Sequence, residues 1–183
     1  MADNKQVKSI GEFYACALLA RHGWAPALTR DGLARTDVLA TRSGTQDTIT
    51  VQVKTTTGDR FVLGSQPSAV GAREWFVLVK IDPDPAGPMR CFVVPRDHVA
   101  AATWICHQNW LTDPAAPRSR TAGQGASRVS MDVFERYENR WDLLDAPSAR
   151  APVLLPDHYR ALALDPRVGL PEGHPWRGSL PTW

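Results

Sequence analysis

Two short apolar runs constrain the fold of this chain more than any other feature. WFVLVKI occupies residues 75–81 and CFVVP occupies residues 91–95. Runs of this length that are rich in β-branched and aromatic residues are typical of buried strands. Between them lie three prolines and a glycine, which predict a turn. The chain is therefore expected to build its core around at least two strands that are covered on both faces.

A second pair of strands is predicted at residues 37–42 and 48–55, joined at Ser43 and Gly44 as a hairpin. In the later strand Ile49, Val51 and Val53 alternate with Thr50, Gln52 and Lys54, so the two sets point to opposite faces. Helices are predicted at residues 5–23, 96–111 and 130–144, the last with Ser130 as its N-cap, and a short one at 157–163. The mixture of helices and strands predicts an α/β (α+β) protein.

The prolines divide the chain into two unequal parts. Seven of the 15 prolines fall in the last 38 residues, which also carry Trp176 and Trp183. A segment of this size cannot fold alone. We therefore expect a main domain over residues 1–145 and a Pro-rich extension over residues 146–183, packed on the core or on a partner subunit.

Composition excludes several classes of protein. Apolar residues make up 43% of the 183 and charged residues 22%, which is typical of a soluble globular domain. No apolar stretch approaches the roughly 18 residues of a membrane span, and MADNKQVKSIGEF lacks an apolar signal core, so a cytoplasmic location is expected. Three cysteines without a CxxC pair argue against a disulfide framework or a zinc site. The net charge of +2, carried by 17 arginines and 4 lysines, neither indicates nor excludes a nucleic-acid partner.

Four polar residues are expected to converge on one point. Gln52 and Lys54 share one face of a strand, Asp37 heads the neighbouring strand, and the preceding helix can bring Glu12 toward them. Carboxylate and amide oxygens suit Mg²⁺, and a lysine beside the ion can hold an attacking water. Each residue also has an ordinary structural explanation. Glu12 is then a solvated helix carboxylate, Asp37 a partner of Arg35, Gln52 a solvent-facing side chain, and Lys54 a charge that protects an edge strand.

Across residues 8–95 the chain resembles the PD-(D/E)XK nuclease superfamily, in particular its Holliday-junction resolvase and Mrr-like branches. The matching segments are GEFYACALLARHGW, ARTDVLATRSG and ITVQVKTTTG. The resemblance implies a restriction-endonuclease-like fold, with a mixed central sheet flanked by helices, to which the composition adds the Pro/Trp-rich C-terminal extension. It implies a metal site for Mg²⁺ or Mn²⁺ at Glu12, Asp37, Gln52 and the Val53 carbonyl, with Lys54 positioning the water. The chain departs from the pattern at Thr36, where a proline is usual, and at Gln52, where a carboxylate is usual.

The leading functional hypothesis is a magnesium-dependent endonuclease that hydrolyses DNA phosphodiester bonds. A basic loop and further arginines would neutralise phosphates: Arg35, Arg60, Arg118, Arg120 and Arg128. Cutting a duplex takes two active sites, so a homodimer is expected. One alternative is a catalytically degenerate nuclease-fold module that binds nucleic acid or a protein partner. Another is an interaction protein whose Trp- and Pro-rich C-terminal third is the working surface.

Overall fold

A five-stranded mixed sheet forms the centre of the structure, a computed structural model that describes residues 3–29, 35–64, 66–115 and 127–183. The strands lie in the order β1 (Trp24–Leu28), β2 (Val38–Arg42), β3 (Thr48–Thr56), β5 (Glu74–Lys80) and β6 (Arg90–Pro95). β3 and β5 run parallel, and the other neighbours are antiparallel. The predicted hairpin and both predicted buried strands are confirmed, as is the mixed α and β class.

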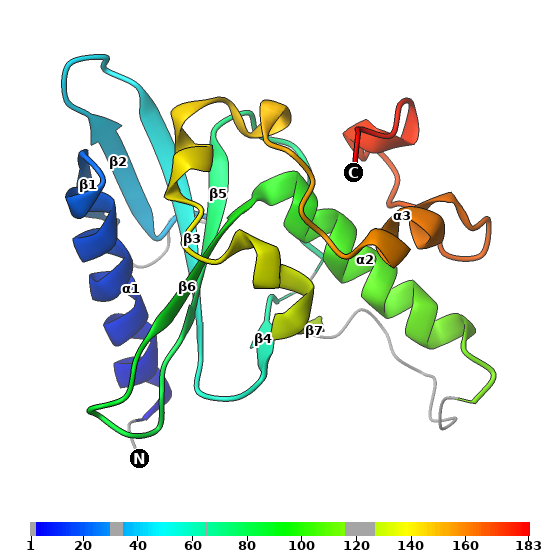
Figure 1. The fold of residues 1–183 in the computed structure, drawn as a ribbon, viewed down its shortest axis with the longest axis horizontal. Helices are drawn as coiled ribbons and strands as arrows, with labels where there is room; N and C mark the ends of the chain where they lie inside the picture. The colour runs from blue at the N-terminus through cyan, green and yellow to red at the C-terminus, as the bar shows by residue number, and fades with distance from the viewer. Residues whose placement is uncertain (1–2, 30–34, 65, 116–126) are drawn as a thin grey trace.

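Two long helices cover opposite faces of this sheet (Figure 1). α1 (Asn4–Arg21) buries Gly11, Ala15 and Leu19, and its N-terminus is fixed by a capping box at Asp3. α2 (Arg96–Thr112) follows β6 directly and packs on β5 and β6. No helix in the described parts of the chain combines the length and apolar character needed to cross a membrane.

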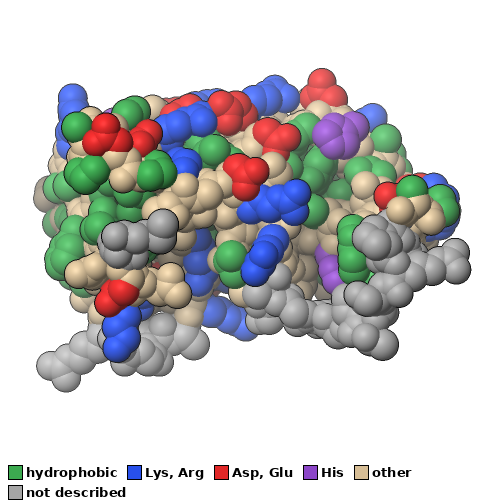
Figure 2. All heavy atoms as spheres, turned by 90° about the horizontal axis from the view of Figure 1, so that it is seen from below, with side chains coloured by type: hydrophobic (Ala, Val, Ile, Leu, Met, Phe, Trp, Pro, Cys, Tyr) green, Lys and Arg blue, Asp and Glu red, His purple; other side chains and the backbone are tan. Residues whose placement is uncertain are grey.

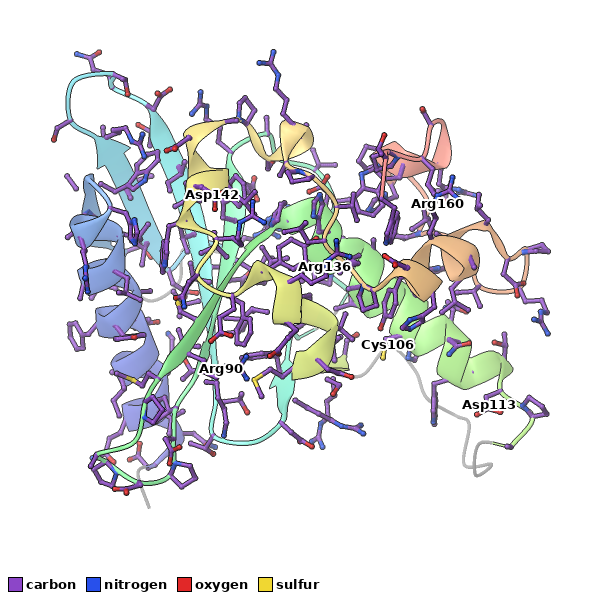
Figure 3. The ribbon with its side chains drawn as sticks, viewed as in Figure 1. Arg90, Cys106, Asp113, Arg136, Asp142 and Arg160 are labelled. Atoms are coloured by element: carbon purple, nitrogen blue, oxygen red, sulfur yellow. The ribbon has the colours of Figure 1, made fainter. Side chains whose placement is uncertain are left out.

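The predicted helix at residues 130–144 is wrong. The segment forms two 3₁₀ turns, η1 (Met131–Tyr137) and η2 (Trp141–Asp145), and Ser130 provides no side-chain cap. The break lies at Glu138, whose backbone is extended and forms a bridge to Phe92 of β6, and at Asn139, which has a φ of 54°. Arg90 adds hydrogen bonds to the carboxylates of Glu135 and Glu138 beside η1 (Figure 3). Pairing with the sheet therefore overrides the helical spacing.

A second, two-stranded sheet joins segments far apart in the sequence. β4 (Arg60–Val62) pairs antiparallel with β7 (Arg128–Ser130), and together they form a short ribbon beside α2. The Sγ of Cys106 on α2 lies 3.9 Å from the carbonyl of Arg128 (Figure 3). Neither strand was predicted from the sequence, because three-residue strands carry too little alternation to detect.

The C-terminal segment contributes apolar side chains to the same core as the sheet. It contains η3 (Ser148–Arg150), the helix α3 (Asp157–Leu164) that packs on α2, and η4 (Pro175–Arg177). Its buried members of the core cluster are Val153, Leu155, Tyr159, Ala163, Val168, Leu170 and Trp176. The division into residues 1–145 and 146–183 stays a prediction.

Candidate active site at the edge of β3

Asp37 sits where the pairing between β2 and β3 ends. The last paired residues are Val38 and Val51, and the backbone N–H of Asp37 donates to the Val51 carbonyl at 2.9 Å. The Asp37 Oδ2 then accepts the N–H of Val53 at 2.8 Å. The N–H and C=O of a strand residue point to the same side, so the Val53 carbonyl also faces this edge. A carboxylate and a backbone carbonyl therefore lie next to each other just beyond the end of the β2 ladder.

These groups open onto a small pocket. A hollow of about 180 Å³ is lined by Asp37, Val53, Lys54, Thr55 and Lys8. The structure thus brings three of the predicted site residues together at one place. Lys8 was not predicted as a site residue. The signal that could have found it is its position four residues before Glu12, the spacing of an ion pair on one helix face.

Glu12 lies beside this pocket rather than among the residues that line it. Its Oε1 is 3.3 Å from the Nζ of Lys8, and only 16% of its side chain is exposed. α1 comes very close to β3 here, since a Cβ on Gly11 would stand 1.9 Å from the Oγ1 of Thr55. Absence of a side chain at Gly11 is therefore what lets Lys8 and Glu12 approach the edge of β3.

Gln52 shares a sheet face with Lys54 by strand alternation, but it is not among the residues that line the pocket. Its Oε1 accepts a hydrogen bond from the Nη2 of Arg96 at 3.3 Å. Arg96 is 2% exposed, forms an ion pair with Glu74, and also donates to the Arg35 carbonyl at 3.2 Å. Burial lowers the pKa of the Arg96 guanidinium, and the carboxylate of Glu74 opposes that shift. The amide of Gln52 is thus occupied by a buried cation that the sequence gave no reason to expect.

Two of the predicted DNA-binding arginines share one face of the β4–β7 ribbon. Phe61 and Val129 are paired and fully buried, so the alternation of each strand turns Arg60 and Arg128 to the opposite, exposed face. Figure 2 views the end of the molecule near this ribbon and shows lysine and arginine side chains along the middle of that face. Arg35 is exposed and has a φ of 72°. Arg118 and Arg120 lie outside the described residues.

Asp37 and Val53 provide the oxygen atoms at the pocket that could bind a divalent cation. Within the described residues, no three His, Cys, Asp or Glu side chains gather as metal ligands. The second oxygen of Asp37 and the Val53 carbonyl are hard donors, and Mg²⁺ commonly takes one or two carboxylates and several waters. These two groups fit such an ion, whereas Glu12 faces Lys8 and Gln52 faces Arg96.

Comparisons of the chain with protein-family models, curated proteins and solved structures gave no match. The function proposed next therefore rests on the side chains and backbone groups of this chain.

Proposed function

We propose that the protein is a divalent-metal-dependent DNA endonuclease with a restriction-endonuclease-like fold. The observation that carries the proposal is the single pocket shared by Asp37, the Val53 backbone and Lys54. The residues that line this pocket come from α1 and the β2–β3 hairpin, and the chain continues to β5, a strand parallel to β3. This order of elements is the one that the resemblance to PD-(D/E)XK nucleases implies. Both the family membership and the hydrolysis of phosphodiesters are part of the proposal.

Asp37 and the Val53 carbonyl are the groups that would hold Mg²⁺ or Mn²⁺. A bound ion of this kind lowers the pKa of a coordinated water and polarises the scissile phosphate. The N–H of Val53 donates to Oδ2 of Asp37, so the other carboxylate oxygen would be the one to bind the ion. Glu12 and Gln52 were predicted as further ligands. In the structure Glu12 contacts Lys8 and Gln52 contacts Arg96, so each contact would have to break before the side chain could bind a metal ion.

Lys54 would orient the attacking water and offset the negative charge that develops on the phosphate. Lys54 lines the pocket, and within the described residues no salt bridge joins its side chain to a carboxylate. A lysine in this setting is available to an incoming phosphate oxygen. Arg60 and Arg128 would contact the DNA backbone outside the pocket, and Arg35, Arg118 and Arg120 remain predicted contacts. A homodimer also remains the expectation for cutting both strands.

The test is a cleavage assay with supercoiled, linear, branched and single-stranded DNA in Mg²⁺ or Mn²⁺. Asp37→Asn and Lys54→Met should each lower the cleavage rate at least about a hundredfold, since each removes a charge that acts on the reacting phosphate. Lys5→Met is the matched control, because Lys5 is an exposed lysine of α1 outside the pocket. Absence of cleavage of every DNA form by the wild type, or full activity in both variants, would contradict the proposal.

A second candidate is favoured by the hydrogen bond between Gln52 and Arg96. If Arg96 keeps Gln52 from a metal, the same fold can serve as a module that binds nucleic acid without cutting it. That function predicts DNA binding that weakens steeply with salt and persists in Lys54→Met, with no cleavage by the wild type. Binding of a protein partner in place of nucleic acid would show as no DNA affinity at any salt concentration.

A further inference from the structure

We propose that Arg96 and Thr29 are positioning residues for the Asp37 carboxylate. Between them they donate a hydrogen bond to each of three successive backbone carbonyls, those of residues 35, 36 and 37. The inference rests on the proposed function in one respect, namely that Asp37 is a metal ligand. Neither Arg96 nor Thr29 is among the residues that line the pocket, and neither was predicted as a site residue.

The backbone just before β2 holds a residue in the left-handed conformation. Arg35 has a φ of 72°, which costs free energy for a residue with a side chain and persists only where contacts hold it. The Nη2 of Arg96 donates to the Arg35 carbonyl at 3.2 Å. Thr29, directly after β1, donates through Oγ1 to the Thr36 carbonyl at 2.5 Å and through its N–H to the Asp37 carbonyl at 2.9 Å. The backbone that carries the carboxylate is thus fixed at three consecutive residues.

Arg96 reaches this backbone across the sheet. It is the first residue of α2, directly after β6, and only 2% of it is exposed. Its guanidinium carbon lies 5.1 Å from the centroid of the Phe76 ring on β5. Its Nε forms the ion pair with Glu74, and its Nη2 donates to the Gln52 Oε1 at 3.3 Å. A buried side chain therefore joins the start of α2 to β5, to β3 and to the approach to β2.

The charge and shape of Arg96 suit positioning rather than ligand binding. Glu74 balances the charge, and burial keeps the guanidinium away from an incoming ligand. Its Nη2 donates to two neutral oxygens, those of Gln52 and Arg35. A guanidinium carries its N–H groups in a rigid planar fork, so it can hold several acceptors in one geometry, which a flexible ammonium does not.

The Asp37 carboxylate depends on this backbone because it stands outside the regular pairing of β2 and β3. That pairing ends at Val38 and Val51, and the Asp37 Oδ2 accepts the N–H of Val53 at 2.8 Å. A metal ligand must be held to within about 0.5 Å of its productive position. Contacts that orient a ligand from outside the metal's own shell commonly change metal affinity tenfold or more.

Two conservative substitutions test the arrangement. Arg96→Lys keeps a positive charge beside Glu74 but loses the fork that reaches the Arg35 carbonyl. Thr29→Val keeps the shape of the side chain but removes the donor to the Thr36 carbonyl. Because Thr29 is only partly buried and neutral, the second variant tests the proposal even where the first is too unstable to study.

Each variant has a matched control. Thr103→Val alters a buried threonine of α2 whose hydroxyl donates to the carbonyls of Val99 and Ala100 in its own helix. Thr41→Val alters a threonine of β2 whose hydroxyl lies 3.4 Å from that of Thr48. Both controls remove a hydroxyl from the same elements without touching residues 35–37.

Two measurements separate positioning from general stability. Amide hydrogen exchange at Val53, without metal, reports the Asp37 carboxylate, because that N–H donates to Oδ2. Exchange of the amides in the β5–β6 ladder, which pairs Val77 with Val93, reports the stability of the whole sheet. Binding of Mn²⁺ without DNA, followed by the electron paramagnetic resonance of the free ion, reports metal ligation. Asp37→Asn is the reference for loss of the ligand.

We expect Arg96→Lys and Thr29→Val to speed exchange at Val53 about tenfold relative to the β5–β6 amides. Each should also weaken Mn²⁺ binding about tenfold, while both controls keep the wild-type values. Unchanged exchange at Val53 in both variants, or unchanged Mn²⁺ affinity in both, overturns the proposal. If exchange at Val53 speeds up but the wild type binds no Mn²⁺, the positioning of Asp37 stands and the metal site of the proposed function fails.

Discussion

The pocket at the edge of β3 differs sharply from a buried polar cluster at the start of α2. At the pocket, charged side chains from α1 and β3 meet at an open hollow. In the cluster, the Nδ1 of His98 lies 2.7 Å from the Tyr137 hydroxyl, which also accepts the N–H of Leu154 at 2.9 Å. The Nε2 of His174 lies 3.0 Å from the Asp97 carbonyl. The cluster thus joins α2 to η1 and to the C-terminal segment.

Burial dominates the ionisation of this cluster. Desolvation, with a smaller contribution from His174, lowers the pKa of His98 to about 3, and desolvation raises the pKa of Asp97 to about 6. The pKa of the Tyr137 hydroxyl is also raised by burial. A strongly shifted pKa is often taken as a sign of a catalytic group. Here the shifts accompany the joining of three segments, which indicates that a perturbed pKa can mark structural burial rather than chemistry.

The largest expected effect is on the free energy of unfolding, and it comes from a substitution in the buried polar cluster rather than in the pocket. Tyr137→Phe would leave the Leu154 N–H and the His98 Nδ1 buried without a partner, so the free energy of unfolding should fall by about 3 kcal/mol. DNA cleavage per folded molecule should not change. Urea unfolding measures the first quantity and an assay well below the unfolding midpoint measures the second. Tyr14→Phe is the control, because its hydroxyl forms one long bond of 3.4 Å to Met89. A loss of activity without a loss of stability would place Tyr137 in the active site instead.

The next effect tests the close contact that brings α1 to the pocket. Gly11→Ala should lower the free energy of unfolding by about 2 kcal/mol, because the new Cβ would stand 1.9 Å from the Thr55 Oγ1 and 3.0 Å from its Cβ. An alanine inside a helix would otherwise stabilise by roughly 1 kcal/mol. Gly58→Ala is the matched control, since the nearest atom to its new Cβ would be 3.7 Å away. A more stable Gly11→Ala protein would show that α1 does not approach β3 this closely.

The smallest effect is a change in pH dependence. Between about pH 4 and 6 the unfolded chain binds a proton at His98 that the folded protein does not, so acid disfavours folding through this group. In the same range the folded protein binds a proton at Asp97 that the unfolded chain does not, so acid favours folding through that group. The two contributions largely cancel in the wild type.

Asp97→Asn removes only the Asp97 contribution. The free energy of unfolding of this variant should therefore fall, relative to wild type, by about 1 kcal/mol for each pH unit of acidification from pH 6 to pH 4. Urea midpoints of both proteins at several pH values measure the difference. Parallel pH profiles would mean that Asp97 is far less buried than the structure shows.

Much of the fold follows from local patterns in the sequence. The two long helices, α1 and α2, and four of the five strands of the sheet were predicted, because their periodicity extends over enough residues. β1 was missed, since Pro26 follows the end of α1 and reads as a helix stop. Directly after β1 the N–H of Thr29 donates to the carbonyl of Asp37, which directly precedes β2. Alternation therefore turns the backbone nitrogen of Pro26 outward, where an edge strand needs no donor. The failure at residues 130–144 has the opposite cause, a helical pattern overridden by pairing of Glu138 with β6.

The candidate site shows the same division between local and distant effects. The sequence alone determined that Gln52 and Lys54 share a face and that Asp37 heads the neighbouring strand, because strand alternation and a short hairpin turn are local. Only the tertiary structure decided which charges those groups meet. Arg96 reaches Gln52 because α2 begins directly after β6, 44 positions away in the chain, and Lys8 reaches the pocket because Gly11 lets α1 pack closely on Thr55. Such contacts depend on how helices pack across a sheet, which no pattern within one segment encodes.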